Sequence, residues 1–214
     1  MKYIVICCEG STEEAFVARV LAPYLEAEIK DVFVTPHNIK GVSDYKKIRE
    51  FVSDFCESSP YALVTTMIDY YGWTKNIPNF VATAGDIYQQ ADNIESAIEK
   101  DLYMFGNLDF NLILHEFEGL LFSDVNAFEG IVGKSQILDL RNILHKAGSN
   151  PELINDNYET APSRRIERIK PDYQKAQDGV EIAGRIGVKK IAEQCRHFGQ
   201  WIERIRAWAK EGAQ

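Results

Sequence analysis

The feature that most constrains the fold is an alternation of short apolar runs with amphipathic segments along the first half of the chain. The apolar runs lie at residues 3–8, 31–35, 61–68 and 110–114. Amphipathic helical segments fall between them, at 11–28, 44–55 and 86–100. Runs of this length that are rich in β-branched residues are typical of buried strands. Strands that alternate with helices predict an α/β fold, here a Rossmann-type parallel sheet of about four strands flanked by helices.

The second half of the chain has a different pattern. Beyond residue 125, apolar residues recur at helical spacing, and we expect helices at 135–146, 182–187, 189–195 and 198–209. In the last of these, Trp201, Ile205 and Trp208 share one face and need a partner surface. We therefore expect residues 1–124 to form the α/β domain and residues 125–214 to form a helical extension packed on the same core.

Several classes of protein are excluded by simple properties of the sequence. A chain of 214 residues suits one domain with an appendage, and its longest apolar runs are too short to cross a bilayer. The chain enters a strand directly after Lys2, without the pattern of a signal peptide. Its cysteines, Cys7, Cys8, Cys56 and Cys195, include no C-x-x-C spacing, which disfavours a zinc site and favours reduced thiols. We expect a cytoplasmic protein.

The charge is unevenly distributed along the chain. The net charge is −8, with −13 in residues 1–159 and +5 in residues 160–214. The overall negative charge disfavours a surface that simply neutralises phosphates. The uneven distribution fits a metal centre beside a flank that binds a polyanion, although basic helices that face water would have the same composition.

Acidic residues stand at the ends of the predicted strands. Glu9 follows the first, Asp69 the third and Glu116 the fourth, and the carboxyl ends of parallel strands are where such folds bind ligands. Glu13 follows Glu9 by about one helical turn, so both carboxylates can reach one hard cation. We predict that the carboxyl groups of Glu9 and Asp69 lie close enough to share an ion. Alternatively, Glu13 interacts with the helix dipole and Asp69 caps a turn.

Two nearby groups of polar residues are open to more than one interpretation. Ser11 and Glu14 have the spacing of a capping box, which assigns Glu14 to the helix start. Glu116 and Glu118 would point the same way from a strand but would diverge in a helix, so both remain candidates. His115 is a candidate ligand or acid–base group, or a histidine that is only hydrogen-bonded.

Basic and aromatic candidates complete the predicted site. Arg164, Arg165 and Lys175 could bind a phosphate with help from a helix N-terminus, unless they belong to a solvated basic helix. We predict that both arginines approach the acidic residues. Tyr71, shortly after the third strand, is a candidate for stacking on a base, with packing as the alternative.

The motif Glu9-Gly10-x-Thr12-Glu13 after the first strand, with an acid after a later central strand, resembles the Toprim fold of topoisomerases, primases and overcoming-lysogenization-defect (OLD-type) nucleases. More closely, five segments resemble a bacterial Toprim-like family of unknown function, whose members are often encoded beside an ABC-type ATPase in defence loci. The segments are Glu9–Glu13, Asp69–Gly72, Leu114–Phe122, Asn150–Arg165 and Cys195–Trp201.

This resemblance implies Mg²⁺- or Mn²⁺-dependent cleavage of DNA or structured RNA, with an ATPase as possible partner. Glu9 would be the Toprim glutamate, Glu13 its OLD-type companion and Asp69 the first acid of an Asp-x-Asp pair. The chain departs from the pattern at Tyr71, which stands where the second acid belongs. Either Glu116 or Glu118 substitutes for it, or one ion is bound instead of two, or the chain is a non-catalytic partner or sensor that binds an ATPase or nucleic acid.

Overall fold

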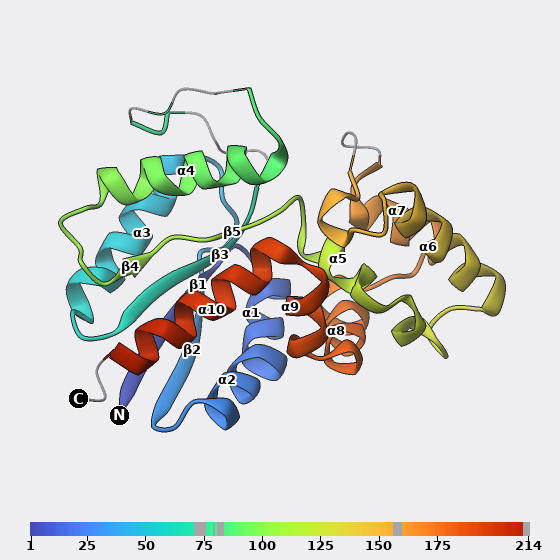
Figure 1. The fold of residues 1–214 in the computed structure, drawn as a ribbon, viewed down its shortest axis with the longest axis horizontal. Coiled ribbons are helices and arrows are strands. Elements are labelled where there is room, and N and C mark those ends of the chain that lie inside the picture. Colours follow the sequence, from blue (N-terminus) through green and yellow to red (C-terminus); the bar gives the residue numbers. More distant parts are fainter. Residues whose placement is uncertain (71–75, 79, 81–83, 156–159, 212–214) are drawn as a thin grey trace.

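A parallel sheet forms the centre of the chain (Figure 1). The computed structural model describes residues 1–70, 76–78, 80, 84–155 and 160–211. The strand order is β2-β1-β3-β4, and β5 also pairs with β3. The strands are β1 (Lys2–Cys8), β2 (Val32–Asn38), β3 (Leu63–Asp69), β4 (Leu108–Asp109) and β5 (Leu112–Ile113). The predicted α/β fold with a parallel sheet is confirmed.

Helices cover both faces of this sheet (Figure 1). One face carries α3 (Tyr45–Ser58) and α4 (Ile87–Asp101). The other carries α1 (Ser11–Phe16), a π-helical turn η1 (Val17–Leu21), α2 (Ala22–Glu28) and α10 (Arg196–Glu211). Alternate residues of β1 supply the two cores, with Ile4 and Ile6 in one and Val5 and Cys7 in the other. Because the strand is buried on both faces, its sequence is a continuous apolar run and does not alternate between apolar and polar residues.

The predicted helical C-terminal part is present and extends beyond the carboxyl edge of the sheet (Figure 1). Its elements are α5 (Phe117–Leu120), η2 (Leu121–Phe128), α6 (Lys134–Lys146), η3 (Pro151–Leu153), α7 (Pro162–Ile169), η5 (Lys175–Gly179), α8 (Val180–Ile186), α9 (Val188–Gln194) and α10. Trp201 and Ile205 of α10 are fully buried in the same core as Ile4 of β1. The Trp201 indole Nε1 also donates a 2.8 Å hydrogen bond to Thr65 Oγ1 on β3.

Two strands differ from the prediction. Strand β2 continues through Pro36, where we expected it to end, because β2 lies at the edge of the sheet and an edge strand tolerates a missing N–H. The strand expected at 110–114 is shortened to β5, and a further short strand, β4, precedes it. Between them, Thr66 Oγ1 accepts a 2.8 Å hydrogen bond from the Asn111 N–H and donates one of 2.6 Å to the Asn111 carbonyl. This hydroxyl replaces the backbone of β3 as Asn111's partner, so the ladder is interrupted there.

The cysteines and the length of the helices were also the subject of predictions. All four cysteines are buried and unpaired with one another. Across the described ranges, no helix combines the length and the apolar character that crossing a membrane requires.

Candidate functional site

The strand order of the sheet reverses between β1 and β3, the position at which sheets of this kind generally bind ligands. The chain leaves β1 toward β2 on one side and reaches β3 on the other, so this is the point where the strand order reverses. Glu9 directly follows β1, and Asp69 is the last residue of β3. The Asp69 N–H donates a 3.0 Å hydrogen bond to Glu9 Oε2, so the two residues lie at the same edge of the sheet.

The backbone around both residues is held by hydrogen bonds. The Glu9 N–H donates to the Met67 carbonyl at 3.0 Å, and the Glu9 carbonyl accepts from the Gly41 N–H at 2.8 Å. Asp69 Oδ1 accepts a 3.1 Å hydrogen bond from the N–H of Phe117, the first residue of α5. The end of β3 therefore holds the start of α5 in place, and Glu116 and Glu118 lie at and within this helix start.

Glu13 closes the N-terminus of α1. Its Oε2 accepts a 3.0 Å hydrogen bond from the Gly10 N–H, and the residue is 7% exposed. The prediction that Glu14 caps this helix with Ser11 is wrong, because the helix begins after Gly10, which makes Glu13 its third residue. Glu14 Oε2 instead accepts from Asn38 Nδ2 at 2.9 Å.

Glu116 and Glu118 have different partners. Glu116 is extended and immediately precedes α5, and its Oε2 accepts a 3.0 Å hydrogen bond from the Ser163 N–H at the start of α7. Glu118 lies within α5, is 2% exposed, and has its Oε1 3.2 Å from Lys175 Nζ of η5. His115 makes the turn before them with a φ of 66°, a left-handed conformation that few non-glycine residues adopt.

The acids at the sheet edge repel one another. Burial, and then the charges of Glu13 and Glu116, raise the pKa of Glu9 to about 7, although the Asp69 N–H and Lys175 act in the opposite direction. Burial, followed by the charges of Glu13 and Glu9, also raises the pKa of Asp69 well above its ordinary value.

Glu13 and Glu118 share this environment. Burial raises the pKa of Glu13. Burial also raises the pKa of Glu118 to about 7, against the opposing charge of Lys175. Burial lowers the pKa of Lys175, but Glu118 and Glu116 outweigh it and the net shift is upward. The edge thus favours bound protons or a cation.

Lys175 is a cation that contacts one of these carboxylates, with its Nζ 3.2 Å from Glu118 Oε1. Arg164 Nη1 lies 2.8 Å from Glu167 Oε2, within α7, and Arg165 Nε donates to the Thr160 carbonyl at 2.5 Å. The expected approach of the two arginines to the acids stays a prediction. His115 is 6% exposed, with Nδ1 3.3 Å from Asn155 Nδ2. Tyr71 lies outside the described residues.

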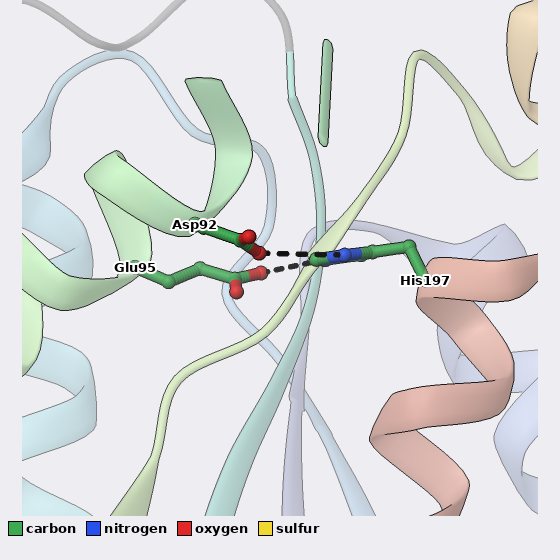
Figure 2. Close-up of side chains that lie close together, drawn as sticks. All are labelled: Asp92, Glu95 and His197. Atoms are coloured by element: carbon green, nitrogen blue, oxygen red, sulfur yellow. Dashed lines mark hydrogen bonds and ion pairs between the residues drawn. The ribbon is translucent and has the colours of Figure 1, made fainter. Parts of the chain in front are cut away.

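A second group of polar side chains was not predicted. One ring nitrogen of His197 and one oxygen each from Asp92 and Glu95 lie within 4.8 Å of one another, and this group could hold a metal ion (Figure 2). In the described part of the chain, no three sheet-edge carboxylates come that close together. The spacing of Asp92 and Glu95 places them on one face of α4. His197 is distant in sequence, so only the fold brings the three residues together.

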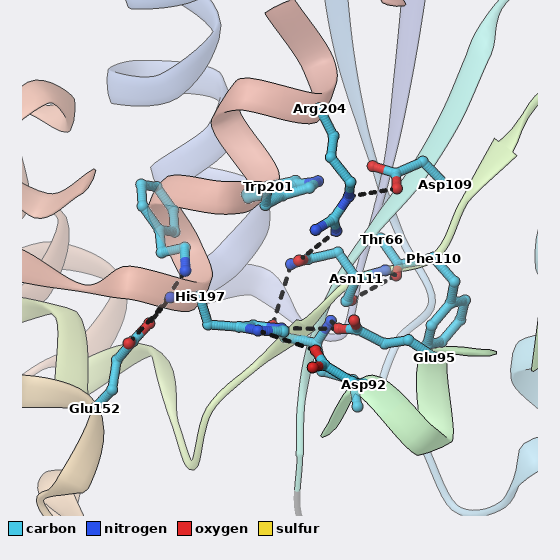
Figure 3. Close-up of polar contacts among 12 residues, drawn as sticks. Thr66, Asp92, Glu95, Asp109, Phe110, Asn111, Glu152, His197, Trp201 and Arg204 are labelled. Carbon is cyan, nitrogen blue, oxygen red and sulfur yellow. Dashed lines mark hydrogen bonds and ion pairs between the residues drawn. The ribbon is translucent and has the colours of Figure 1, made fainter. Parts of the chain in front are cut away.

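Hydrogen bonds fix the surroundings of this second group (Figure 3). Glu152 Oε1 accepts from the N–H groups of His197 and Phe198, at 3.0 and 3.1 Å. Glu95 Oε1 accepts a 2.7 Å hydrogen bond from the Leu112 N–H of β5. The start of α10 is therefore tied both to η3 and, through His197 and Glu95, to α4.

Comparison with known proteins places the chain in a family. No curated protein matches the sequence. The C-terminal region of the Burkholderia pseudomallei OLD protein aligns over 98% of this chain and 99% of that chain, with 17% identity and a TM-score of 0.48. The C-terminal region of the Xanthomonas campestris pv. campestris OLD protein, phased with mercury, aligns over 94% and 97%, with 14% identity and a TM-score of 0.42. The family model described as "Domain of unknown function (DUF4276)" matches residues 8–206, and the chain therefore belongs to this family.

Proposed function

We propose that the chain is a divalent-metal-dependent phosphodiesterase that cleaves nucleic acid. One observation carries the proposal: acids from three chain segments meet at the switch point of the sheet, where burial and the charges of neighbouring acids raise the pKa values of Glu9, Asp69 and Glu118. The acids of this group are Glu9, Glu13, Asp69, Glu116 and Glu118. A concentration of negative charge that is so poorly solvated is typical of a functional site, since it costs stability unless something is bound.

The donor atoms fit a hard divalent cation. The acids offer oxygen ligands, which Mg²⁺ and Mn²⁺ prefer, and Glu9 remains partly exposed to solvent. Glu9, Glu13 and Asp69 would hold the ion. Their oxygens do not all lie within 4.8 Å of one another in the metal-free chain, so binding would require these side chains to draw closer. When bound, it would neutralise charge on the phosphate and on the leaving oxygen.

The remaining residues of the site have distinct proposed tasks. Lys175, whose side chain is 42% exposed, can turn from Glu118 to a phosphate oxygen and offset its charge. Glu118, with a pKa of about 7, is suited to accept a proton near neutral pH. Arg164 lies on the exposed side of α7, where it can bind the phosphates of a long substrate. His115 is 6% exposed and Glu118 2%, so either would act on a substrate only after movement of its neighbours.

The test is cleavage of labelled duplex DNA, single-stranded DNA and tRNA by the purified protein, with Mg²⁺, with Mn²⁺ and with EDTA. Cleavage should require a divalent ion and be lost in Glu9→Gln. It should be retained in Glu57→Gln, which makes the same change at an exposed residue of α3. Equal cleavage by Glu9→Gln and wild type would remove Glu9 from the mechanism.

A non-catalytic role is the second candidate, and the tyrosine at position 71, in place of the second acid that the Toprim resemblance calls for, favours it. In that case the chain would bind nucleic acid or an ABC-type ATPase subunit in the cytoplasm without cleavage. Binding of the same labelled substrates by wild type and Glu9→Gln alike, with no products in any metal, would support this alternative.

A further inference from the structure

Three side chains from two helices converge in a group that includes none of the sheet-edge carboxylates. Asp92 and Glu95 project from α4, and His197 projects toward them from the first turn of α10 (Figure 2). His197 Nε2 lies 2.9 Å from Glu95 Oε1, and His197 Nδ1 lies 4.0 Å from Asp92 Oδ1. The group combines one imidazole with two carboxylates, which are common ligands of transition metals.

The imidazole nitrogen that faces Asp92 lacks a hydrogen-bond partner. His197 is 1% exposed, and its Nδ1 is buried without a hydrogen bond. Buried polar atoms of this kind are uncommon, because losing water without a replacement partner costs free energy. The 4.0 Å separation from Asp92 Oδ1 is too long for a hydrogen bond. Two tetrahedral ligands that are about 2.0–2.2 Å from one ion stand roughly 3.3–3.6 Å apart, so a small movement of the Asp92 side chain would complete the pair.

The other atoms of the histidine are already held in place. Its Nε2 contacts Glu95 Oε1, which also accepts the Leu112 N–H, and its backbone N–H binds Glu152 (Figure 3). A histidine that ligates a metal commonly has its second nitrogen and its orientation fixed in this way. The Asp92 side chain is 65% exposed and can move toward the ring, and it leaves the site open to an ion from solution.

We propose that Asp92 and His197 Nδ1 bind a divalent first-row transition-metal ion between α4 and α10, with Glu95 holding Nε2 of the ring in place and water completing the coordination. The mixed nitrogen and oxygen ligands favour Zn²⁺ over Mg²⁺, which prefers oxygen. The ion ties the last helix to the helix on the opposite side of the sheet. This site is separate from the sheet-edge carboxylates and does not depend on the proposed phosphodiesterase activity.

The simplest competing explanation is a structural contact between His197 and Glu95 that needs no metal. Asp92 separates the two explanations, because its exposed carboxylate adds little to such a contact but is a ligand of the ion. Asp92→Asn keeps the size of the side chain and removes its charge. Asp54→Asn makes the same change at an exposed position of α3, outside the group.

The experiment is calorimetric titration of Zn²⁺ into EDTA-treated, dialysed protein, with all variants made in a Glu9→Gln background so that the sheet edge contributes little. Zn²⁺ affinity should fall by at least about 10-fold in Asp92→Asn, because loss of a direct ligand costs no less than loss of an outer-shell partner, and stay unchanged in Asp54→Asn. Zn²⁺ should also raise the melting temperature of the Glu9→Gln parent and the Asp54→Asn variant, but not that of Asp92→Asn. Equal affinity in the parent and Asp92→Asn, or no Zn²⁺ binding by the parent, would overturn the proposal.

Discussion

Glu118 illustrates the cost of an acid that the fold buries. Its pKa rises from 4.5 to about 7, so between these values the folded chain holds a proton that the unfolded chain has released. The stability of the metal-free protein should therefore fall as the pH rises through this window and level off above it. Melting curves in EDTA between about pH 5 and about pH 8 measure the effect.

The matching variant is Glu118→Gln, which removes the titrating group and retains its shape. Its melting temperature should vary less with pH across the same window, while Glu57→Gln should follow wild type. An unchanged pH dependence in Glu118→Gln would mean that the buried carboxyl group does not titrate there.

Lys175 offsets the charge of Glu118. Replacing it with methionine leaves the ionised Glu118 buried without its partner, so Lys175→Met should lower the free energy of unfolding by about 1–2 kcal/mol at a pH above 7. We keep this value low because the lysine side chain is 42% exposed and water screens the pair. Urea denaturation measures the loss, which should shrink at lower pH as Glu118 becomes protonated. Lys175→Arg is the control, and a loss equal at both pH values would contradict the pairing.

At the residue scale, sequence reasoning placed Glu9 and Asp69 at one edge of the sheet but did not predict how the neighbouring side chains are oriented. Glu9 and Asp69 were found because strand ends in a parallel sheet meet at one edge. Glu13 accepts the Gly10 N–H because the helix begins one residue earlier than the spacing of Ser11 and Glu14 indicated. The contact between Lys175 and Glu118 joins distant segments and has no local pattern.

At the scale of elements, the start of α10 depends on a buried acid from another segment. Glu152 of η3 is 3% exposed and accepts the N–H groups of His197 and Phe198. Glu152→Gln weakens both bonds and should lower the free energy of unfolding by about 1–3 kcal/mol. For a chain of this size each kcal/mol corresponds to about 2–4 °C in melting temperature.

Glu50→Gln serves as the control, since its pair with Lys46 is exposed and should contribute about 0.5 kcal/mol or less. Calorimetric melting of both variants gives the comparison. Glu152→Gln and Glu50→Gln with equal melting temperatures would show that the acid does not support the helix.

Elements with a strong local pattern were predicted well, and those set by tertiary contacts were not. The helix expected from residue 86 is capped by Asp86, whose carboxylate accepts the Gln89 N–H. The division between β4 and β5 depends on a buried hydroxyl, Thr66, that binds Asn111 across the sheet. We expected the second strand to end before Pro36, because a proline is not tolerated inside a central strand. The order of the strands places it at the sheet edge, and sequence spacing does not predict that order.

At the scale of the whole molecule, the sheet and the helical C-terminal part share one hydrophobic core. That core joins Ile4 of β1 and Phe16 of α1 to Trp201 of α10. Residues from both halves also complete the sheet-edge group, because Lys175 contacts Glu118 and Ser163 binds Glu116. The C-terminal helices therefore contribute contacts to the group of acids that lies at the strand ends.

The central claim is that the sheet-edge carboxylates bind a divalent cation. Its most direct test is calorimetric titration of Mg²⁺ into wild type, Glu9→Gln and Glu57→Gln at a pH where the acids are ionised. Mg²⁺ is the appropriate probe because it prefers oxygen ligands, which this edge supplies and the His197 group supplies only in part. Saturable binding by wild type and Glu57→Gln, weakened at least about 10-fold in Glu9→Gln, is the predicted result. Equal Mg²⁺ affinity in wild type and Glu9→Gln would contradict the account.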